Sequence, residues 1–395
     1  MLKLNKRLTA GLLAFFLSAV ILFSMAAVFE VGLFEHNMYD SYTKQALAWR
    51  EGRTYLASAD TDSLKYLELA IFDNKFYVSF PPVPTVIELG LTFLFGEKTP
   101  NHFMLFIYGI ASAVALTVFF AKKHKLSVAL LYGLLFSVGT NIIAIIAFGG
   151  VWHEAQMLSF LLCSLAVALM QAENKILNGL SLFCAALAVG CRPFTAIFIP
   201  ILLWRLYCKN KGQKLVSFLP YLIAPALVAV ALMWCNFVRF GSVLEFGHNY
   251  LPEFLREEDG QFNLSYLLPN LVQAIKLPIA IENGTVSFAF NKFSANIFYL
   301  VNPAILVFLV YLIRNCIKNR KALDYVFLAC FVLFVAATCM HRTLGGYQFG
   351  ARYFLDFIPY LALYVNEEKL KLNVPVAVLT VFGIALNFYG AGLVV

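Results

Sequence analysis

The residues best suited to acid–base chemistry lie between positions 30 and 100, a stretch that holds ten of the chain's 22 acidic residues. Asp40 stands at the start of a segment in which Tyr42, Ala46 and Trp49 recur at helical spacing. The free backbone N–H groups at a helix start favour a carboxylate, so Asp40 could be a plain helix cap. The alternative is a general base, which removes a proton from an attacking group.

Two further polar motifs occur in the same stretch. Asp60 and Asp62 form an Asp-x-Asp pair, which binds a divalent metal in some enzymes, but its polar, turn-like surroundings favour a solvated loop. Asp73 opens a turn that precedes a short strand with alternating apolar residues at 76–80. A Pro-Pro pair then leads into an apolar segment.

Basic residues elsewhere in the chain could hold an anion. Arg192 interrupts an apolar run from about 176 to 206 that is too long for one membrane span, so the chain must turn at this arginine. An arginine there either snorkels toward water or meets an anion such as a phosphate group. A glycine-rich segment adds His341, Arg342 and Arg352, and its glycines allow close approach of the backbone. These four basic residues are predicted to bind a phosphate.

Other polar and aromatic residues are expected to line the same cavity. His153 and Glu154 follow Trp152 at a helix boundary, where they form either part of the cavity or a pair at headgroup level. The predicted lining residues are Tyr42, Asp73, Tyr77, His153, Glu154, Tyr347 and Tyr353. The eight cysteines are scattered and include no Cys-x-x-Cys pair, so we expect small buried side chains and assign no metal ligands.

Membrane helices must position these residues. The chain is 61% hydrophobic and 13% charged, whereas soluble domains carry about 25% charged residues. Repeated long apolar runs predict an all-α polytopic membrane protein that forms a single membrane domain over residues 1–395. We expect about eleven transmembrane helices, within a range of roughly ten to twelve, at about 8–28, 103–121, 127–147, 155–170, 176–190, 193–207, 215–236, 298–313, 324–340, 354–366 and 374–392.

The distribution of charge predicts the orientation. Seventeen of the 30 Lys and Arg residues fall in the N-terminal segment and in the short loops of one side, which indicates that this side and the N-terminus are cytoplasmic. The long polar loops at 30–100 and 237–297 are then extracytoplasmic. The run at 82–96 is read as an interfacial helix within the first of these loops. We therefore expect a multi-pass plasma-membrane protein whose active face is extracytoplasmic.

The short cytoplasmic loops exclude several classes of function. They leave no room for a nucleotide-binding domain, and the chain has no Walker loop. The net charge of +8 is assigned to cytoplasmic Lys and Arg, so nucleic acid is not an expected partner. A sugar on a lipid phosphate is an energised substrate on the outer side. A carboxylate would deprotonate an acceptor hydroxyl, and arginines would stabilise the phosphate as it leaves the anomeric carbon.

The layout resembles the GT-C superfamily of polyprenyl-phosphate-sugar glycosyltransferases, which includes protein O-mannosyltransferases and the lipid A aminoarabinose transferase. One helix precedes a large outer loop with an acid at the start of a surface helix, and an interfacial helix follows. The short motifs that carry the likeness are Tyr39-Asp40-x-Tyr42, Asp73 to Pro82, Arg192-Pro193, Arg239-Phe-Gly and Gly346 to Tyr353.

This resemblance implies an inverting transfer of a sugar from a polyprenyl-phosphate carrier to an acceptor hydroxyl on the outer face. It implies that Asp40 is the base and that Arg192 and Arg352 bind the donor phosphate. No cofactor is expected, and a divalent metal is left open because Ser41 follows Asp40 where many relatives have an acid or amide. The expected partners are the lipid-linked sugar, membrane lipids, and a glycan, lipid or protein acceptor of the cell envelope.

Two other functions stay open at this point. A transporter or flippase of lipid-linked saccharides would need ionisable residues in the middle of the membrane and repeated halves, and neither is evident in the sequence. A non-catalytic membrane subunit of a glycosylation complex would fit the sparse acidic residues. The glycosyltransferase is the leading hypothesis.

Overall fold

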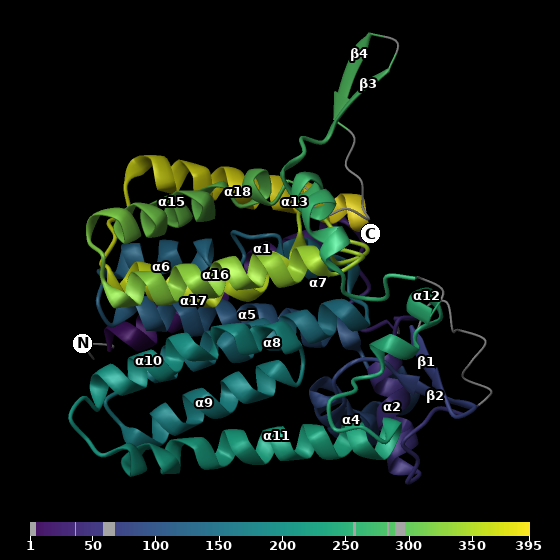
Figure 1. Ribbon diagram of the computed structural model, residues 1–395. Coiled ribbons are helices and arrows are strands. Elements are labelled where there is room, and N and C mark those ends of the chain that lie inside the picture. The colour runs from purple at the N-terminus through teal and green to yellow at the C-terminus, as the bar shows by residue number, and fades with distance from the viewer. Residues whose placement is uncertain (1–4, 36, 58–67, 256–257, 283, 289–296) are drawn as a thin grey trace.

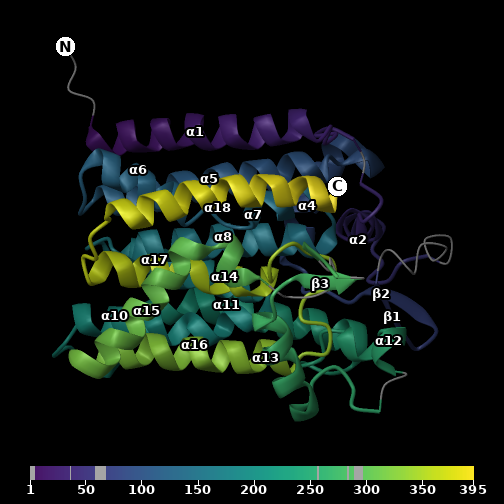
Figure 2. The same ribbon diagram turned by 90° about the horizontal axis from the view of Figure 1, so that it is seen from above.

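The computed structural model describes residues 5–35, 37–57, 68–255, 258–282, 284–288 and 297–395. Figures 1 and 2 show a bundle of long helices that run in a common direction, with connections at its two ends. The end near the N-terminus carries only short connections. The other end also carries short helices and hairpins, and we call it the loop end; its described residues are 29–35, 37–57, 68–100, 241–255, 258–282, 284–288, 297–302 and 341–351.

The bundle forms because apolar runs bury one face against neighbouring helices and present the other to lipid. Its helices are α1 (Lys6–Val28), α5 (Asn101–Ala121), α6 (Leu126–Leu135), α7 (Ile142–Phe148), α8 (Val151–Met170), α9 (Lys175–Val189), α10 (Ile199–Lys209), α11 (Leu219–Phe240), α15 (Pro303–Lys318), α16 (Ala322–Met340), α17 (Ile358–Glu367) and α18 (Val374–Val394). The 3-10 turns η4 (Leu215–Phe218), η3 (Pro193–Phe198) and η7 (Arg352–Phe357) lead into α11, α10 and α17.

The loop end is built from short elements. They are α2 (Ser41–Arg50), β1 (Leu69–Phe72), β2 (Lys75–Val78), α4 (Val83–Phe95), η2 (Gly96–Lys98), η5 (His248–Tyr250), α12 (Pro252–Leu255), η6 (Leu264–Tyr266), α13 (Leu267–Ile275), β3 (Ile279–Glu282), β4 (Thr285–Phe288) and α14 (Phe298–Val301). Strands β1 and β2 pair antiparallel, with Leu69 opposite Val78. Asp73 and Asn74 form the turn between them with positive φ values of 50° and 55°, as two-residue hairpin turns require.

The prediction of an all-α polytopic membrane protein is confirmed. Each predicted apolar run contains a helix, and in the described chain six helices are long and apolar enough to cross a membrane. They are Lys6–Val28, Asn101–Ala121, Val151–Met170, Leu215–Phe240, Ala322–Met340 and Val374–Val394. The other bundle helices are shorter, so the total of eleven spans stays a prediction.

The predicted continuous helix at 127–147 is wrong, because the chain breaks there into α6 and α7. Asn141 occupies the break and is fully buried. Its amide donates to the carbonyls of Phe349, at 3.1 Å, and Gly350, and its Oδ1 accepts from Asn302 at 3.2 Å. A buried amide needs such partners. The break therefore ties the bundle to the glycine-rich segment before η7.

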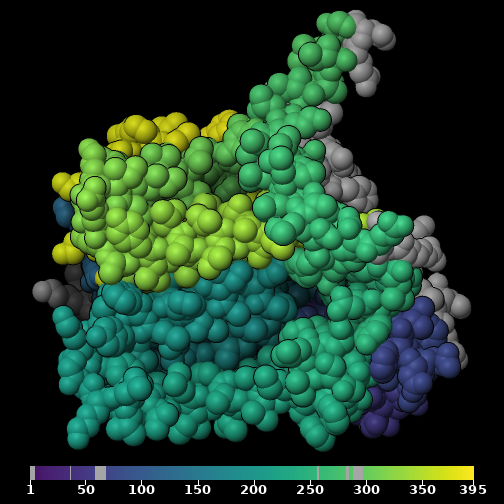
Figure 3. All heavy atoms as spheres, viewed as in Figure 1, coloured from purple at the N-terminus to yellow at the C-terminus, as the bar shows by residue number. Residues whose placement is uncertain are grey.

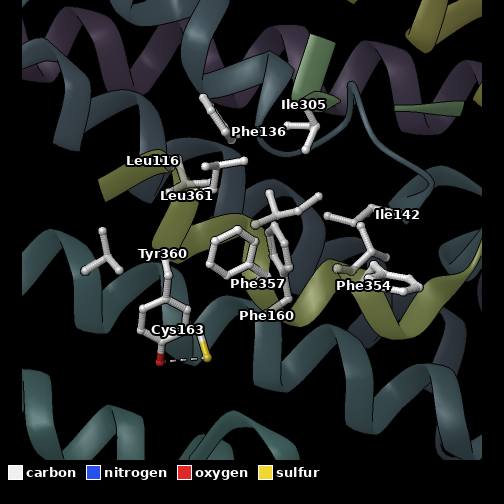
Figure 4. Close-up of a cluster of buried hydrophobic side chains, with 14 of the residues drawn as sticks. Leu116, Phe136, Ile142, Phe160, Cys163, Ile305, Phe354, Phe357, Tyr360 and Leu361 are labelled. Atoms are coloured by element: carbon white, nitrogen blue, oxygen red, sulfur yellow. Dashed lines mark hydrogen bonds between the residues drawn. The ribbon is translucent and has the colours of Figure 1, made fainter. Parts of the chain in front are cut away.

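A core of aromatic and aliphatic side chains fixes α17 against α8 (Figure 4). Phe160 and Cys163 from α8 lie beside Phe357 and Tyr360 from the η7–α17 unit. The Tyr360 hydroxyl donates to the Cys163 sulfur at 3.6 Å, so the one polar atom of that ring is satisfied. This packing holds the start of η7 at a fixed position at the loop end.

The loops that the charge pattern assigned to one side do lie together. Glu367, after α17, accepts from Lys123 at 3.1 Å and from Arg205 at 3.0 Å. Glu368 accepts from Lys321 at 2.7 Å. These pairs bring four connections to the end of the bundle opposite the loop end. The assignment of that end to the cytoplasm stays a prediction.

Helix α4 is the predicted interfacial segment at 82–96. It packs against α2 at the loop end, outside the bundle. Val86, Phe93 and Leu94 expose apolar side chains, whereas Glu88 is fully buried beneath them. An exposed apolar face over a buried polar one is typical of a helix that lies in the membrane surface.

Candidate active site

The loop end encloses a cavity of about 1060 Å³, which is at the upper end for small-molecule sites. Segments far apart in the chain build its wall, and Figure 3 shows the blue first-loop and green second-loop segments in contact at this end. The polar and aromatic lining residues that matter below are Tyr39, Glu68, Trp152, Arg192, Glu253, Gln261, His341, Arg342, Tyr347, Arg352 and Tyr353.

Arg192 projects into the cavity from the turn between α9 and η3. Its Nε donates to both carboxylate oxygens of Asp356, at 2.7 and 3.0 Å. Its guanidinium carbon lies 4.6 Å from the ring centroid of Tyr353. Within the described chain, the guanidinium of Arg192 donates hydrogen bonds through Nε alone, which leaves its two terminal nitrogens for a ligand.

Arg352 reaches the same part of the cavity from the start of η7. Its Nε donates to the Gly345 carbonyl at 2.7 Å, and its Nη1 donates to Gln156 at 3.2 Å. Its guanidinium also lies over the Tyr353 ring, 4.9 Å from the centroid. Burial lowers the pKa of Arg352 to about 10, so the group is still a cation at neutral pH.

Gln156 and Asp356 join these two arginines, which we call the arginine pair. The Gln156 amide donates to Asp356 at 2.7 Å and to the Arg352 carbonyl at 3.1 Å. Both side chains are buried, so the network holds the guanidinium groups in place. Two positive charges share one carboxylate here. The arginine pair and Asp356 together therefore carry a net positive charge beside the cavity in a partly dry setting, which suits a phosphate.

His341 lines the cavity but does not supply the positive charge that was predicted. It is buried, and burial lowers its pKa to about 3, with the charges of His248 and the arginine pair acting in the same direction. Its Nδ1 accepts from the Thr343 backbone at 3.2 Å, and its Nε2 lies 3.1 Å from the Gln261 amide nitrogen. The ring is therefore neutral at pH 7.

Arg342 also lines the cavity, beside the second loop. Its backbone N–H donates to the Gln261 carbonyl at 3.1 Å, and its Nη1 donates to the Glu253 carbonyl at 3.2 Å. It is half-buried, whereas Arg352 is buried. Arg342 thus belongs to a different part of the wall from the arginine pair.

Asp40 begins α2, as predicted, but it does not line this cavity. Its carboxylate makes no capping hydrogen bond to α2 within the described chain, and Lys44 Nζ lies 3.7 Å from Oδ2. The preceding residue, Tyr39, lines the cavity instead and packs its ring against Phe148 and Trp152, with centroids 5.3 Å apart in both cases. The Asp40 side chain is buried.

Asp40 belongs to a group of buried carboxyls between α2, α4 and α8. Glu88 accepts from the Thr43 hydroxyl at 3.0 Å, and Glu154 accepts from the Asn101 amide at 3.2 Å. Burial raises the pKa of Glu88, and the charge of Asp40 acts in the same direction. The described residues contain no group of His, Cys, Asp and Glu placed to hold a metal ion. Asp60 and Asp62 lie outside the described residues.

Three solved structures share the architecture of this chain. ArnT from Cupriavidus metallidurans bound to undecaprenyl phosphate aligns over 95% of this chain and 62% of its own length, with a TM-score of 0.55 and 10% identity. ArnT from the same organism in the apo state aligns over 90% of this chain and 60% of its own length, with a TM-score of 0.52 and 12% identity. The apo oligosaccharyltransferase of Archaeoglobus fulgidus aligns over 97% of this chain and 56% of its own length, with a TM-score of 0.52 and 12% identity.

The chain has a GT-C-like fold. It spans between 56% and 62% of the length of these structures. No protein-family model and no curated protein sequence matches it.

Within this GT-C-like fold, the predicted lining residues divide into two sets. Tyr347 and Tyr353 line this cavity together with the four predicted basic residues. The other five, which are Tyr42, Asp73, Tyr77, His153 and Glu154, are not among the residues that line it. Four of these are buried in the packing around α2, α8 and the first hairpin, while Asp73 is exposed at the hairpin turn.

Sequence reasoning missed several residues of the site. Asp356 and Gln156 lie in apolar helical segments, and a buried acid there signals a nearby cation. Glu68 was one acid among many in the first loop, and no local pattern distinguished it. His248 and Glu253 come from the second loop, which was assigned only a general role.

Proposed function

We propose that this protein moves a sugar from a polyprenyl-phosphate carrier to an acceptor hydroxyl at the extracytoplasmic face of the plasma membrane. The observation that carries the proposal is the arginine pair, which places two guanidinium groups and one compensating carboxylate at the wall of a large cavity. The GT-C-like fold supports it, since one solved structure with this fold, ArnT, is bound to undecaprenyl phosphate.

The chemistry follows from the charge of the site. The acceptor oxygen attacks the anomeric carbon, and the bond from that carbon to the phosphate oxygen breaks. The leaving phosphate gains negative charge, which Arg192 and Arg352 stabilise at a fixed distance without reorganising. A single displacement of this kind inverts the anomeric centre. Asp40, the base implied by the family resemblance, keeps that role only as a prediction.

The direct test measures the release of polyprenyl phosphate from a defined sugar donor. Purified protein in lipid nanodiscs is incubated with a panel of polyprenyl-phosphate sugars and a cell-envelope extract as acceptor. Mass spectrometry then follows the release of polyprenyl phosphate. Release that depends on both the protein and the extract is expected for at least one sugar. If the carrier stays glycosylated with every donor, the proposed function is wrong.

Phosphate binding by the arginine pair can be tested without knowing the sugar. We expect undecaprenyl phosphate to raise the melting temperature of the wild type, while the uncharged polyprenol does not. Arg352→Gln removes a hydrogen-bonding cation, worth about 1.5–3 kcal/mol, so it should weaken binding by about 10- to 100-fold. Arg342→Gln is the matched control and should keep most of the affinity. Equal losses of affinity in the two variants would contradict the assignment of phosphate binding to the arginine pair.

A further inference from the structure

Of the described residues, two acids line the cavity that holds the arginine pair, and neither is Asp40. They are Glu68, from the first loop, and Glu253, from the second. A reaction that takes a proton from an acceptor hydroxyl needs a base within hydrogen-bond reach of that hydroxyl. An acid in the cavity wall satisfies this condition without rearrangement of the wall, whereas Asp40 does not line the cavity.

The backbone of Glu68 has an unusual conformation and a hydrogen bond to a neighbouring strand end. The residue adopts φ 47°, a left-handed conformation that is uncommon outside glycine, immediately before β1. The Ser79 hydroxyl donates to the Glu68 carbonyl at 3.0 Å, across the first hairpin. The Ser79 carbonyl in turn lies 2.7 Å from Nδ1 of His248. Strain in a residue that its surroundings hold in place is often found at functional sites.

The surroundings of the Glu68 carboxyl suit proton transfer. Burial raises its pKa to about 7. A hydrogen bond from the Trp152 side chain lowers the pKa, the charge of Glu253 raises it, and the charge of Arg352 lowers it. An acid–base group works best when its pKa lies near the operating pH. Glu68 and Arg352 line the same cavity, so this carboxyl lies in the wall that also carries the predicted phosphate-binding arginine pair.

Glu253 is less well placed for the same role. It lies on the four-residue helix α12, and its backbone carbonyl accepts from Arg342. Burial raises the pKa of its carboxyl, and the charge of Arg342, which lies beside the second loop, lowers it. Its position near the second loop therefore fits contact with the acceptor or the sugar, at a distance from the phosphate.

We propose that Glu68 is the general base of the transfer, an inference that rests on the proposed function. Its carboxylate accepts the proton of the acceptor hydroxyl while the oxygen forms a bond to the anomeric carbon. The electron pair of the breaking carbon–oxygen bond goes to the polyprenyl phosphate, which leaves toward Arg192 and Arg352. The proton on Glu68 returns to water when the products depart.

The test compares Glu68→Gln with Asp40→Asn and the wild type in the carrier-release assay. Glu68→Gln should lower kcat by about 10²- to 10⁴-fold, the usual contribution of a general base. Its binding of undecaprenyl phosphate, measured by thermal shift, should stay within about threefold of wild type. The kcat of Glu68→Gln should fall below that of Asp40→Asn. Glu51→Gln, an exposed acid of the same loop, should behave as wild type.

The pH profile separates a base from a residue that only shapes the cavity. In the wild type, kcat should decrease as the pH falls below about 7. Glu68→Asp should keep partial activity, and the midpoint of this decrease should lie at a different pH. An unchanged midpoint in Glu68→Asp would overturn the proposal, and this variant decides the matter if Glu68→Gln does not fold. Full kcat in Glu68→Gln beside an inactive Asp40→Asn would also overturn it and return the role to Asp40.

The same assay distinguishes failure of this inference from failure of the proposed function. If the wild type releases carrier and Glu68→Gln does so equally well, only the assignment of the base is wrong. If the wild type releases no carrier from any donor, the proposed transfer function is wrong, and the proposed role of Glu68 in it is wrong as well.

Discussion

At the scale of single residues, the site depends on which side chains are held in place by others. Arg192 and Arg352 come from distant parts of the chain, yet Asp356 and Gln156 lock them into one network. Glu68, from the first loop, lines the same cavity as these arginines. Desolvation raises the pKa of its carboxyl, so its titration should be visible in the stability of the protein.

The raised pKa of Glu68 predicts how stability depends on pH. Its pKa is about 7 in the folded protein, above its ordinary value of 4.5, so the folded state binds more protons than the unfolded state between these values. The contribution of Glu68 to the free energy of unfolding is fully present below about pH 4.5 and is lost as the pH rises through 7. The melting temperature of Glu68→Gln minus that of the wild type should therefore rise from pH 5 to pH 8.

Differential scanning fluorimetry of both proteins across this range checks the prediction. Glu51→Gln, which removes an exposed acid of the same loop, provides the control and should show a constant difference. A constant difference for Glu68→Gln would show that its pKa is ordinary.

At the scale of elements, the break between α6 and α7 and the segment before η7 act as one unit. Asn141 binds the carbonyls of Phe349 and Gly350, so the helix break supports the backbone that leads to Arg352. Gly350 has φ 72°, and a Cβ placed there would lie 2.4 Å from a methyl group of Val301. The position therefore needs glycine for both its conformation and its close packing.

Gly350→Ala is expected to lower stability and to weaken binding of undecaprenyl phosphate, because the chain must shift next to Arg352. Gly346→Ala is the matched control, since Gly346 has φ 65° but no atom within 4 Å of the added Cβ. The Gly346→Ala variant should lose about 1 kcal/mol of stability from the left-handed conformation, without the clash. Thermal melts with and without the lipid phosphate measure both effects. Equal behaviour of the two variants would contradict the argument from packing.

At the scale of the whole molecule, the two ends of the bundle differ in charge and in complexity. Short basic connections gather at one end, where Glu367 and Glu368 pair with three of them. The cavity lies at the other end, among the long loops. We expect the basic end to face the cytoplasm, because short loops rich in Lys and Arg are retained there.

Cysteine labelling in intact cells tests this orientation. Lys211→Cys and Ser287→Cys place a thiol in an exposed position at the basic end and at the loop end respectively, each in a background without the eight native cysteines. A membrane-impermeant maleimide should label Ser287→Cys directly and Lys211→Cys only after permeabilisation. The reverse pattern would place the cavity on the cytoplasmic side.

Much of the molecule could be predicted from the sequence, because hydrophobic runs and charge bias act locally. Apolar runs indicate membrane helices wherever they occur, and an arginine that interrupts such a run must meet water or an anion. The helical runs, the hairpin at Asp73, and the gathering of Arg192 and Arg352 at one cavity all followed from such patterns.

Only the tertiary structure decided which acid faces the cavity. Helix α2 buries Ser41, Tyr42, Thr43 and other residues around most of its surface, so it has no apolar stripe that fixes its rotation. Packing against α4 sets that rotation, and Tyr39 lines the cavity whereas Asp40 does not. Glu68 and the arginine pair line one cavity although they come from distant segments, which no local pattern in the sequence records.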